Sequence, residues 1–116
     1  MILEAIESKL GELDPNVFYG MVKRNMSQTL WNYIVFDRKV MSTSTNKTGY
    51  TDYYRVHIVR EKWIPEGLAE KVIEKMEEIA GMKVAKTEMQ YNYVQKGNTD
   101  TVVEMLTIEF HRVSKV

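Results

Sequence analysis

The clearest pattern in the chain is an amphipathic helix in its second half. Apolar residues recur there at spacings of three and four, which places them on one helical face. They are Leu68, Ala69, Val72, Ile73, Met76, Ile79 and Ala80. Pro65 suits a first helical position, where no backbone N–H is needed, and Gly81 suits the left-handed residue that often ends a helix. We therefore predict one helix between Pro65 and Gly81, packed by its apolar face.

Strands are predicted on both sides of this helix, because apolar and polar residues alternate there. The predicted strands are residues 17–22, 30–40, 53–63, 83–96 and 101–113. A first helix is predicted over residues 2–13, and Pro15 stops it because proline disfavours helix at the residue before it. The predicted order is α-β-β-β-α-β-β. The predicted fold class is α+β, a mainly antiparallel sheet packed by the central amphipathic helix.

Residues 41–52 form a polar stretch with no periodicity between two of these strands. The stretch is too long for a tight hairpin turn, so we expect a flexible loop there. The chain has no internal repeat and no linker-like tract. Residues 1–116 are therefore expected to form a single domain.

Composition narrows the classes of protein further. The formal net charge is zero and the sequence contains no cysteine, so neither a basic nucleic-acid surface nor a disulfide framework is indicated. The N-terminal segment lacks the basic region of a signal peptide, and no apolar run is long enough to span a membrane. We expect a soluble intracellular domain that is the full gene product.

Catalytic and cofactor motifs are absent from the sequence. His57 and His111 stand far apart, and no glycine-rich phosphate loop or nucleophile elbow is present. We expect no enzymatic activity, no cofactor and no metal site, although a pair of catalytic carboxylates leaves no local signature. A stacking platform for single-stranded nucleic acid is an alternative that the tyrosines leave open. Those tyrosines are Tyr50, Tyr53, Tyr54, Tyr91 and Tyr93.

Acidic residues repeat every four positions along the predicted central helix. They are Glu66, Glu70, Glu74 and Glu78. This acidic ridge is either a solvated helix face or a contact with a basic patch on a neighbouring subunit. Candidate patches are Lys23 with Arg24, Arg38 with Lys39, and Arg112 with Lys115. A contact between two different faces is head-to-tail, and repeated contacts of that kind close into rings.

Two segments carry a resemblance to a known family. The segment Tyr53–Glu61 runs into Trp63-Ile64-Pro65-Glu66-Gly67, and Tyr91-Asn92-Tyr93 is followed by the hairpin sequence of residues 96–106. Together with the order helix, strands, helix, hairpin, these segments resemble small tail terminator proteins of long-tailed phages and prophages. Such proteins are also called tail completion or minor capsid proteins. The resemblance extends over nearly the whole chain.

The resemblance implies a structural function. Such proteins form a ring, typically hexameric, at the head-proximal end of the tail tube, where the ring stops tube polymerisation and helps join tail to head. Their partners are further copies of the same chain, the tail tube protein and the head completion or connector protein. No membrane, sequence-specific nucleic acid or cofactor is implied. The expected location is the tail or neck of the virion, and the host cytoplasm during assembly.

The resemblance does not identify site residues, because no functional residue of the family can be matched to a position in this sequence. The two sites below are inferred from the sequence pattern instead. We expect the polar loop to be an assembly contact, through Ser42, Thr43, Ser44, Thr45, Asn46, Lys47 and Thr48. We expect the acidic ridge of Glu66, Glu70, Glu74 and Glu78 to be a lateral subunit contact. The alternatives are another head–tail joining protein at the neck, or a small nucleic-acid-binding or ligand-binding domain.

Overall fold

The computed structural model describes residues 1–22, 31–43, 49–85 and 88–115. In order along the chain, the elements in these residues are α1 (Ile2–Gly11), β1 (Val17–Tyr19), β2 (Tyr33–Thr43), β3 (Gly49–Glu61), α2 (Leu68–Glu77), β4 (Met82–Val84), β5 (Tyr91–Gln95) and β6 (Val102–Lys115). The α+β class is confirmed. The predicted order was wrong in one respect, because the single strand expected over residues 83–96 is two short strands, β4 and β5.

The strands form one mixed sheet in the order β1-β2-β3-β6-β4, with β5 also beside β6. Every pairing is antiparallel except that of β1 with β2, which is parallel. The longest pairing joins β3 to β6 from Gly49 opposite Lys115 to Glu61 opposite Val103. The centre of the sheet is therefore built from segments far apart in sequence.

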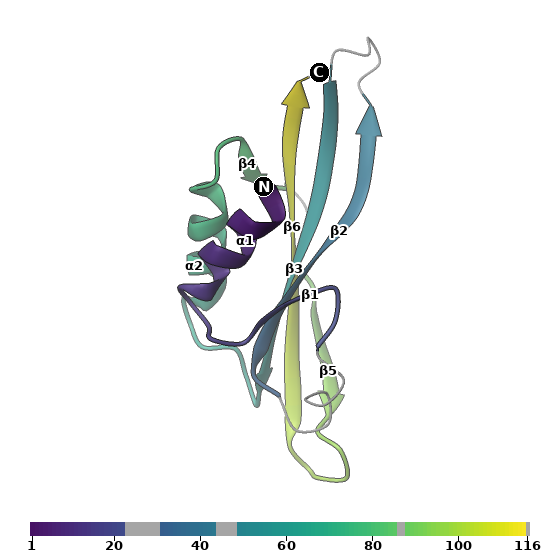
Figure 1. Cartoon of the computed structure of the whole chain (residues 1–116). Coiled ribbons are helices and arrows are strands. Elements are labelled where there is room, and N and C mark those ends of the chain that lie inside the picture. Colours follow the sequence, from purple (N-terminus) through teal and green to yellow (C-terminus); the bar gives the residue numbers. More distant parts are fainter. Residues whose placement is uncertain (23–30, 44–48, 86–87, 116) are drawn as a thin grey trace.

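Both helices cover the same face of this sheet (Figure 1). The predicted alternation is confirmed, since alternate residues of the three long strands point into one core with the helices. That core contains Ile6, Leu10, Ile34, Phe36, Tyr54, Val56, Ile58, Val72, Met76, Ile79, Met82, Leu106, Ile108 and Phe110. We call the opposite side the second face; neither helix covers it, and there Val59 and Val103 are also buried.

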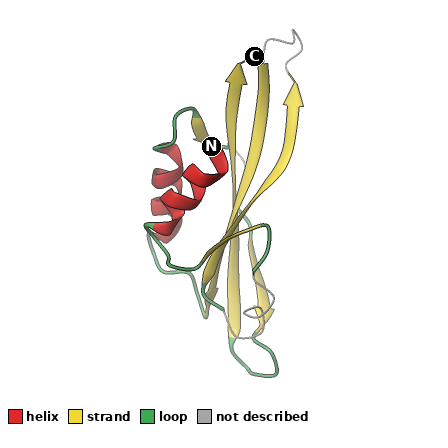
Figure 2. Ribbon diagram, in the orientation of Figure 1, coloured by secondary structure: helices red, strands yellow, loops and turns green. Residues whose placement is uncertain are grey.

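The molecule is elongated, with extents of 53 × 28 × 21 Å and a radius of gyration of 15.3 Å. A compact domain of this length would have a radius of gyration of about 13 Å. Figure 2 shows the reason, because the strands continue past the helices at both ends. We call one end the distal ribbon (residues 38–43, 49–54 and 110–115) and the other the β5 end (residues 91–106).

The start of the central helix was predicted wrongly. Helix α2 begins at Leu68, after Gly67 at φ +86°, and not at Pro65. The preceding segment forms a turn outside the helix, in which the Leu68 N–H donates to the Pro65 carbonyl, and the Ile64 N–H donates to Glu104 Oε1 at 2.8 Å. Gly81 has the expected left-handed conformation, at φ +81°. The helix itself ends earlier, at Glu77.

The flexible loop predicted over residues 41–52 is largely strand. Met41 pairs with Asp52 and Thr43 pairs with Tyr50, so β2 and β3 continue as an antiparallel ribbon. Threonine and tyrosine favour strands. The alternation that marks a strand is missing because this part of the ribbon extends past the helices and has no apolar core face. Residues 44–48 lie outside the described residues.

Candidate functional site

The predicted assembly contact falls at the tip of the distal ribbon. Ser42 and Thr43 are exposed residues of β2 at that tip. The other five predicted contact residues, Ser44, Thr45, Asn46, Lys47 and Thr48, lie outside the described residues. The part of the site that can be placed is therefore the end of a strand, where the ribbon continues past the helices (Figure 1).

The predicted acidic ridge is not a continuous row on one helix. Glu70 and Glu74 are exposed on α2, but Glu66 precedes the helix and Glu78 follows it. Neither Glu70 nor Glu74 makes an ion pair with a described residue. These two residues present free carboxylates, as a lateral contact would require.

Glu78 already has an intramolecular role. Its Oε1 lies 2.8 Å from Lys9 Nζ, and Lys75 Nζ lies 2.9 Å from Glu12 Oε1. These pairs join α1 to α2. The hydrogen bond from Lys9 lowers the pKa of Glu78, and the hydrogen bond to Glu12 raises the pKa of Lys75. Sequence spacing gave no signal for these pairs, because each joins residues more than sixty positions apart.

The helix side of the molecule is nevertheless strongly acidic. Residues 2–14 and 64–81 contain nine acidic residues and three lysines. Five exposed carboxylates there make neither an ion pair nor a side-chain hydrogen bond with any residue that the structure describes, and we call them the acidic helix layer. They are Glu4, Glu7, Glu66, Glu70 and Glu74.

The distal ribbon has the opposite charge. Its three segments contain four basic residues and one acidic residue. Arg38 is exposed and donates from Nε to the Tyr19 hydroxyl at 3.1 Å, whereas Lys39 forms an ion pair with Glu109. Arg112 Nε donates to the carbonyl of Ala80, just after α2. Of the predicted basic patches, the pair Lys23 and Arg24 lies outside the described residues.

The second face of the sheet has a polar network that the sequence did not reveal. His57 Nε2 lies 3.0 Å from Asp37 Oδ2, and His57 Nδ1 lies 2.9 Å from Thr107 Oγ1. Asp37 Oδ1 also accepts from Arg55 Nε at 2.8 Å. The network joins β2, β3 and β6 side by side. Within the described ranges, no three potential metal ligands come together here or elsewhere.

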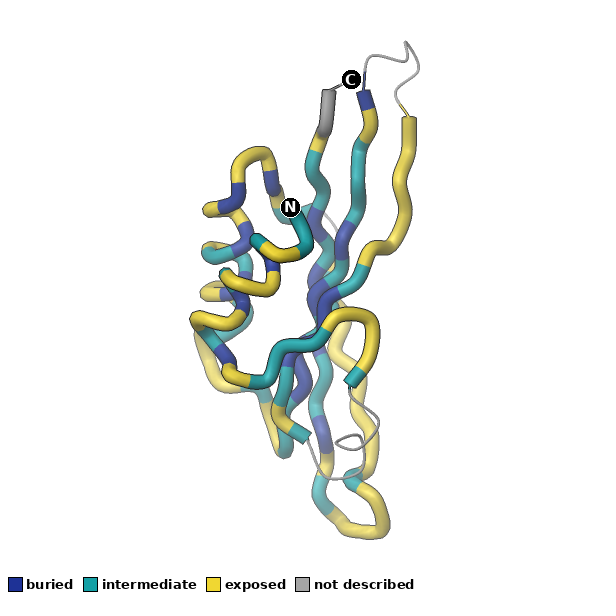
Figure 3. The backbone as a smooth tube through the Cα atoms, viewed as in Figure 1, coloured by how far each residue is buried: buried dark blue, intermediate teal, exposed yellow. Residues whose placement is uncertain are grey.

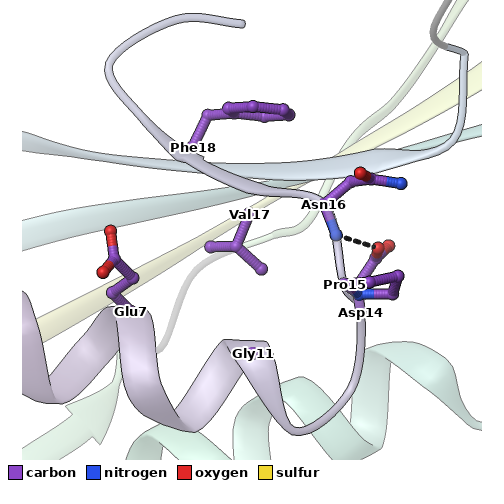
Figure 4. A pocket seen from close by; sticks show the side chains of 7 residues that line it. All are labelled: Glu7, Gly11, Asp14, Pro15, Asn16, Val17 and Phe18. Atoms are coloured by element: carbon purple, nitrogen blue, oxygen red, sulfur yellow. Dashed lines mark hydrogen bonds between the residues drawn. The ribbon is translucent and has the colours of Figure 1, made fainter.

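A groove of about 520 Å³ lies between α1 and β1, and Figure 4 shows the residues that line it. Val17 points toward α1, whereas Phe18 points away from it. The buried carboxylate in the lining, Asp14, accepts from the Asn16 N–H at 2.8 Å and is paired with Arg60. Glu7, the other carboxylate of this lining, makes no ion pair with a described residue.

The tyrosines considered as a stacking platform do not share one surface. Tyr54 is buried in the core, and Tyr53 packs against His111 with ring centroids 6.2 Å apart. Tyr91 and Tyr93 are exposed on β5, at the other end of the molecule. Single-stranded nucleic acid stacks on neighbouring aromatic rings, so this arrangement does not favour that alternative.

No protein-family model matches the chain, and no curated protein matches it. The resemblance to tail terminators therefore rests on the two sequence segments and the element order given above. No helix in the described part of the chain is both long enough and apolar enough to cross a membrane.

Proposed function

We propose that this chain is a structural protein of a long-tailed phage or prophage particle. In this proposal it is a tail terminator, which forms a ring at the head-proximal end of the tail tube. The ring stops tube polymerisation and helps join the tail to the head. The protein acts through surface complementarity with its own copies, with the tail tube protein and with the head completion or connector protein, and not through catalysis.

The observation that carries this proposal is the extension of the sheet beyond its helical cover. Large apolar side chains are exposed at both ends of the subunit. On the distal ribbon Val40 is 51% and Met41 is 62% exposed, and at the β5 end Tyr91 is 52% and Tyr93 is 59% exposed. Apolar surface left in water favours contacts with other proteins. A subunit with such surface at two opposite ends suits an assembly with several neighbours.

The charge distribution also supports a ring. A chain with zero net charge is divided into an acidic helix layer and a basic distal ribbon. Unlike surfaces attract each other, so the acidic helix layer of one copy and the basic distal ribbon of another suit a contact between two different faces. Head-to-tail contacts generate rings when the rotation between neighbours closes.

The proposal is tested with the purified chain and the tail tube protein of the same particle. We expect light scattering and negative-stain images to reveal a ring of about six subunits, alone or on tube ends. We also expect the chain to arrest tube polymerisation at a capped end. A chain that stays monomeric and neither binds nor caps the tube would overturn the proposal. Binding to the head connector without any effect on tube growth would instead indicate the neck protein.

A further inference from the structure

Among the residues that the structure describes, strand edges without a pairing partner lie at both ends of the molecule, at β5 and at the end of β2. We propose that the outer edge of β5 pairs with the end of β2 (Val40–Thr43) in the next copy, so that the sheet continues from subunit to subunit. This inference rests on the proposed ring, and it specifies how neighbouring subunits join.

At three residues of β5 the backbone N–H and C=O groups point away from β6, toward the outer edge of the sheet. The Ala85 N–H donates to the Glu109 carbonyl, so odd-numbered residues of β6 face the side where β4 and β5 lie. The register places Asn92 and Val94 opposite odd-numbered residues of β6, so these two bond to β6. The alternate residues Tyr91, Tyr93 and Gln95 then direct N–H and C=O groups away from the sheet. All five residues of β5 are exposed (Figure 3).

Strand β5 lacks the usual protection of an edge strand. Exposed edges are normally blocked by charged residues, proline or a β-bulge. The sequence of β5, YNYVQ, contains no charge and no proline, and its register with β6 runs without a shift. Tyrosine and valine are also strong strand formers. The strand is thus suited to accept another strand.

Strand β2 offers the second edge. On its outer side the Phe36 carbonyl accepts from the Gly20 N–H, but β1 pairs with no residue beyond Phe36. The register with β3 shifts between Arg38 and Val40, so Val40 and Ser42 then face β3, while Met41 and Thr43 face outward. Residues 40–43 are uncharged and exposed. They follow directly after Arg38 and Lys39.

The charges around β5 favour its pairing with β2 of another copy over its pairing with a second β5. Glu66, Glu70 and Tyr91 line one groove of about 460 Å³, so acidic residues lie beside β5. Glu88 and Asp100, which flank β5 in sequence, are exposed and make no ion pair with a described residue. Pairing two β5 strands about a two-fold axis would bring these carboxylates together. Pairing β5 with β2 brings them toward Arg38 instead.

The positions of the two edges suit a ring. The end of β2 and strand β5 lie at opposite ends of the molecule (Figure 1). A pair of joined copies therefore still has one unused edge of each kind, which is the condition for head-to-tail growth and closure. A short strand pairing buries little area, so we expect weak association of free subunits and stronger association once the ring closes.

Cross-linking tests the pairing directly, because the chain contains no cysteine of its own. In the double variant Met41→Cys with Tyr93→Cys, a short bismaleimide added to the concentrated protein should produce a ladder of covalent oligomers. The matched control is Ser8→Cys with Tyr93→Cys. Ser8 is also exposed, but it lies on α1 and not on either of the two strand edges, so this variant should produce no ladder. A strong covalent dimer from Tyr93→Cys alone would overturn the inference in favour of β5–β5 pairing.

Proline tests the backbone contribution. Tyr93→Pro removes an outward N–H, so the fold should persist by circular dichroism while the oligomer and the ladder are lost. Tyr93→Thr is the matched control, because it removes the ring but keeps the N–H, and it should retain the ladder. Rings or tube caps that form equally well with Tyr93→Pro would overturn the edge pairing and leave the proposed function intact. A wild-type chain that never assembles, even with tube protein, would overturn both.

Discussion

Asp14 Oδ2 lies 2.6 Å from Arg60 Nη2, and the two side chains are only 6% and 14% exposed. Arg60 also donates to the carbonyls of Tyr33 and Val59. Asp14 in turn accepts from the Asn16 N–H. One ion pair therefore fixes the connection that follows α1 against β2 and β3.

Removing the carboxylate of Asp14 should destabilise the fold strongly. Asp14→Ala leaves the Arg60 guanidinium buried without its partner, at a cost of about 3–5 kcal/mol in the free energy of unfolding. Urea denaturation measures this difference. Asp100→Ala is the control, since Asp100 is exposed in the β5–β6 turn and should change the free energy by about 0.5 kcal/mol or less. A loss below about 1 kcal/mol for Asp14→Ala would mean that the pair behaves as a surface salt bridge.

Two glycines should respond in opposite directions to alanine. Gly81 has φ +81°, so Gly81→Ala forces an alanine into the left-handed region at a cost of about 1–2 kcal/mol. Gly11 ends α1 without a positive φ, and an added Cβ there would meet no atom within 4 Å. Gly11→Ala should therefore stabilise the protein by about 0.5–1 kcal/mol. Thermal denaturation of both variants checks the sign, and equal shifts would contradict it.

Acid should remove the contribution of Glu78 to stability. The hydrogen bond from Lys9 lowers the pKa of Glu78 in the folded state below its ordinary 4.5. The carboxylate therefore stabilises the fold above that pH, and the stabilisation is lost as the pH falls through the folded-state pKa. Glu78→Gln should lower the urea midpoint at neutral pH and have no effect in strong acid. Glu74→Gln is the control and should have little effect at either pH, because Glu74 lacks an ion pair to a described residue.

Reversing the charge of the exposed carboxylates on α2 should weaken ring formation. Glu70→Lys with Glu74→Lys replaces two uncommitted carboxylates with cations and should lower the oligomer mass measured by light scattering. Adding Arg38→Glu to this variant should restore part of the assembly if Arg38 is the partner. An unchanged oligomer in the double variant would remove these residues from the lateral contact.

Shortening the tip of the distal ribbon should separate folding from assembly. Replacing residues 44–49 with Asn-Gly keeps Thr43 opposite Tyr50, and a two-residue Asn-Gly turn suits an antiparallel hairpin. The circular dichroism spectrum should be unchanged, whereas tube capping should be lost. Capping at the wild-type level would show that the predicted loop contact is wrong.

Local patterns in the sequence predicted strands and the buried face of the central helix. The alternation around Ile34 and Phe36 indicated a strand with large apolar groups on both faces, and the helical spacing of Val72 and Met76 identified core residues, because burial imposes that period. The same reasoning failed at residues 41–43 and 49–52. There the strands extend past the helices, so no core imposes alternation on them.

Relations between distant residues were beyond prediction from the sequence. The parallel pairing of β1 with β2 and the place of β6 beside β3 depend on the packing of the whole chain. The exposure of Glu70 and Glu74 could be predicted from helix spacing. The ion pair between Lys9 and Glu78 could not, because Lys9 and Glu78 are 69 positions apart. The edge of β5 was hidden for the same reason, since one predicted strand covered both β4 and β5.

Strand β6 follows every other strand in sequence but lies between β3 on one side and β4 and β5 on the other. Ribosomes make the chain from its N-terminus, so the core remains open until Leu106, Ile108 and Phe110 have been synthesised. Until then the long edge of β3 is available to any other chain nearby, which is the condition under which nascent sheets aggregate. Non-local pairing of this kind also folds slowly. Yield in the cell should thus depend on how quickly translation passes through the final strand.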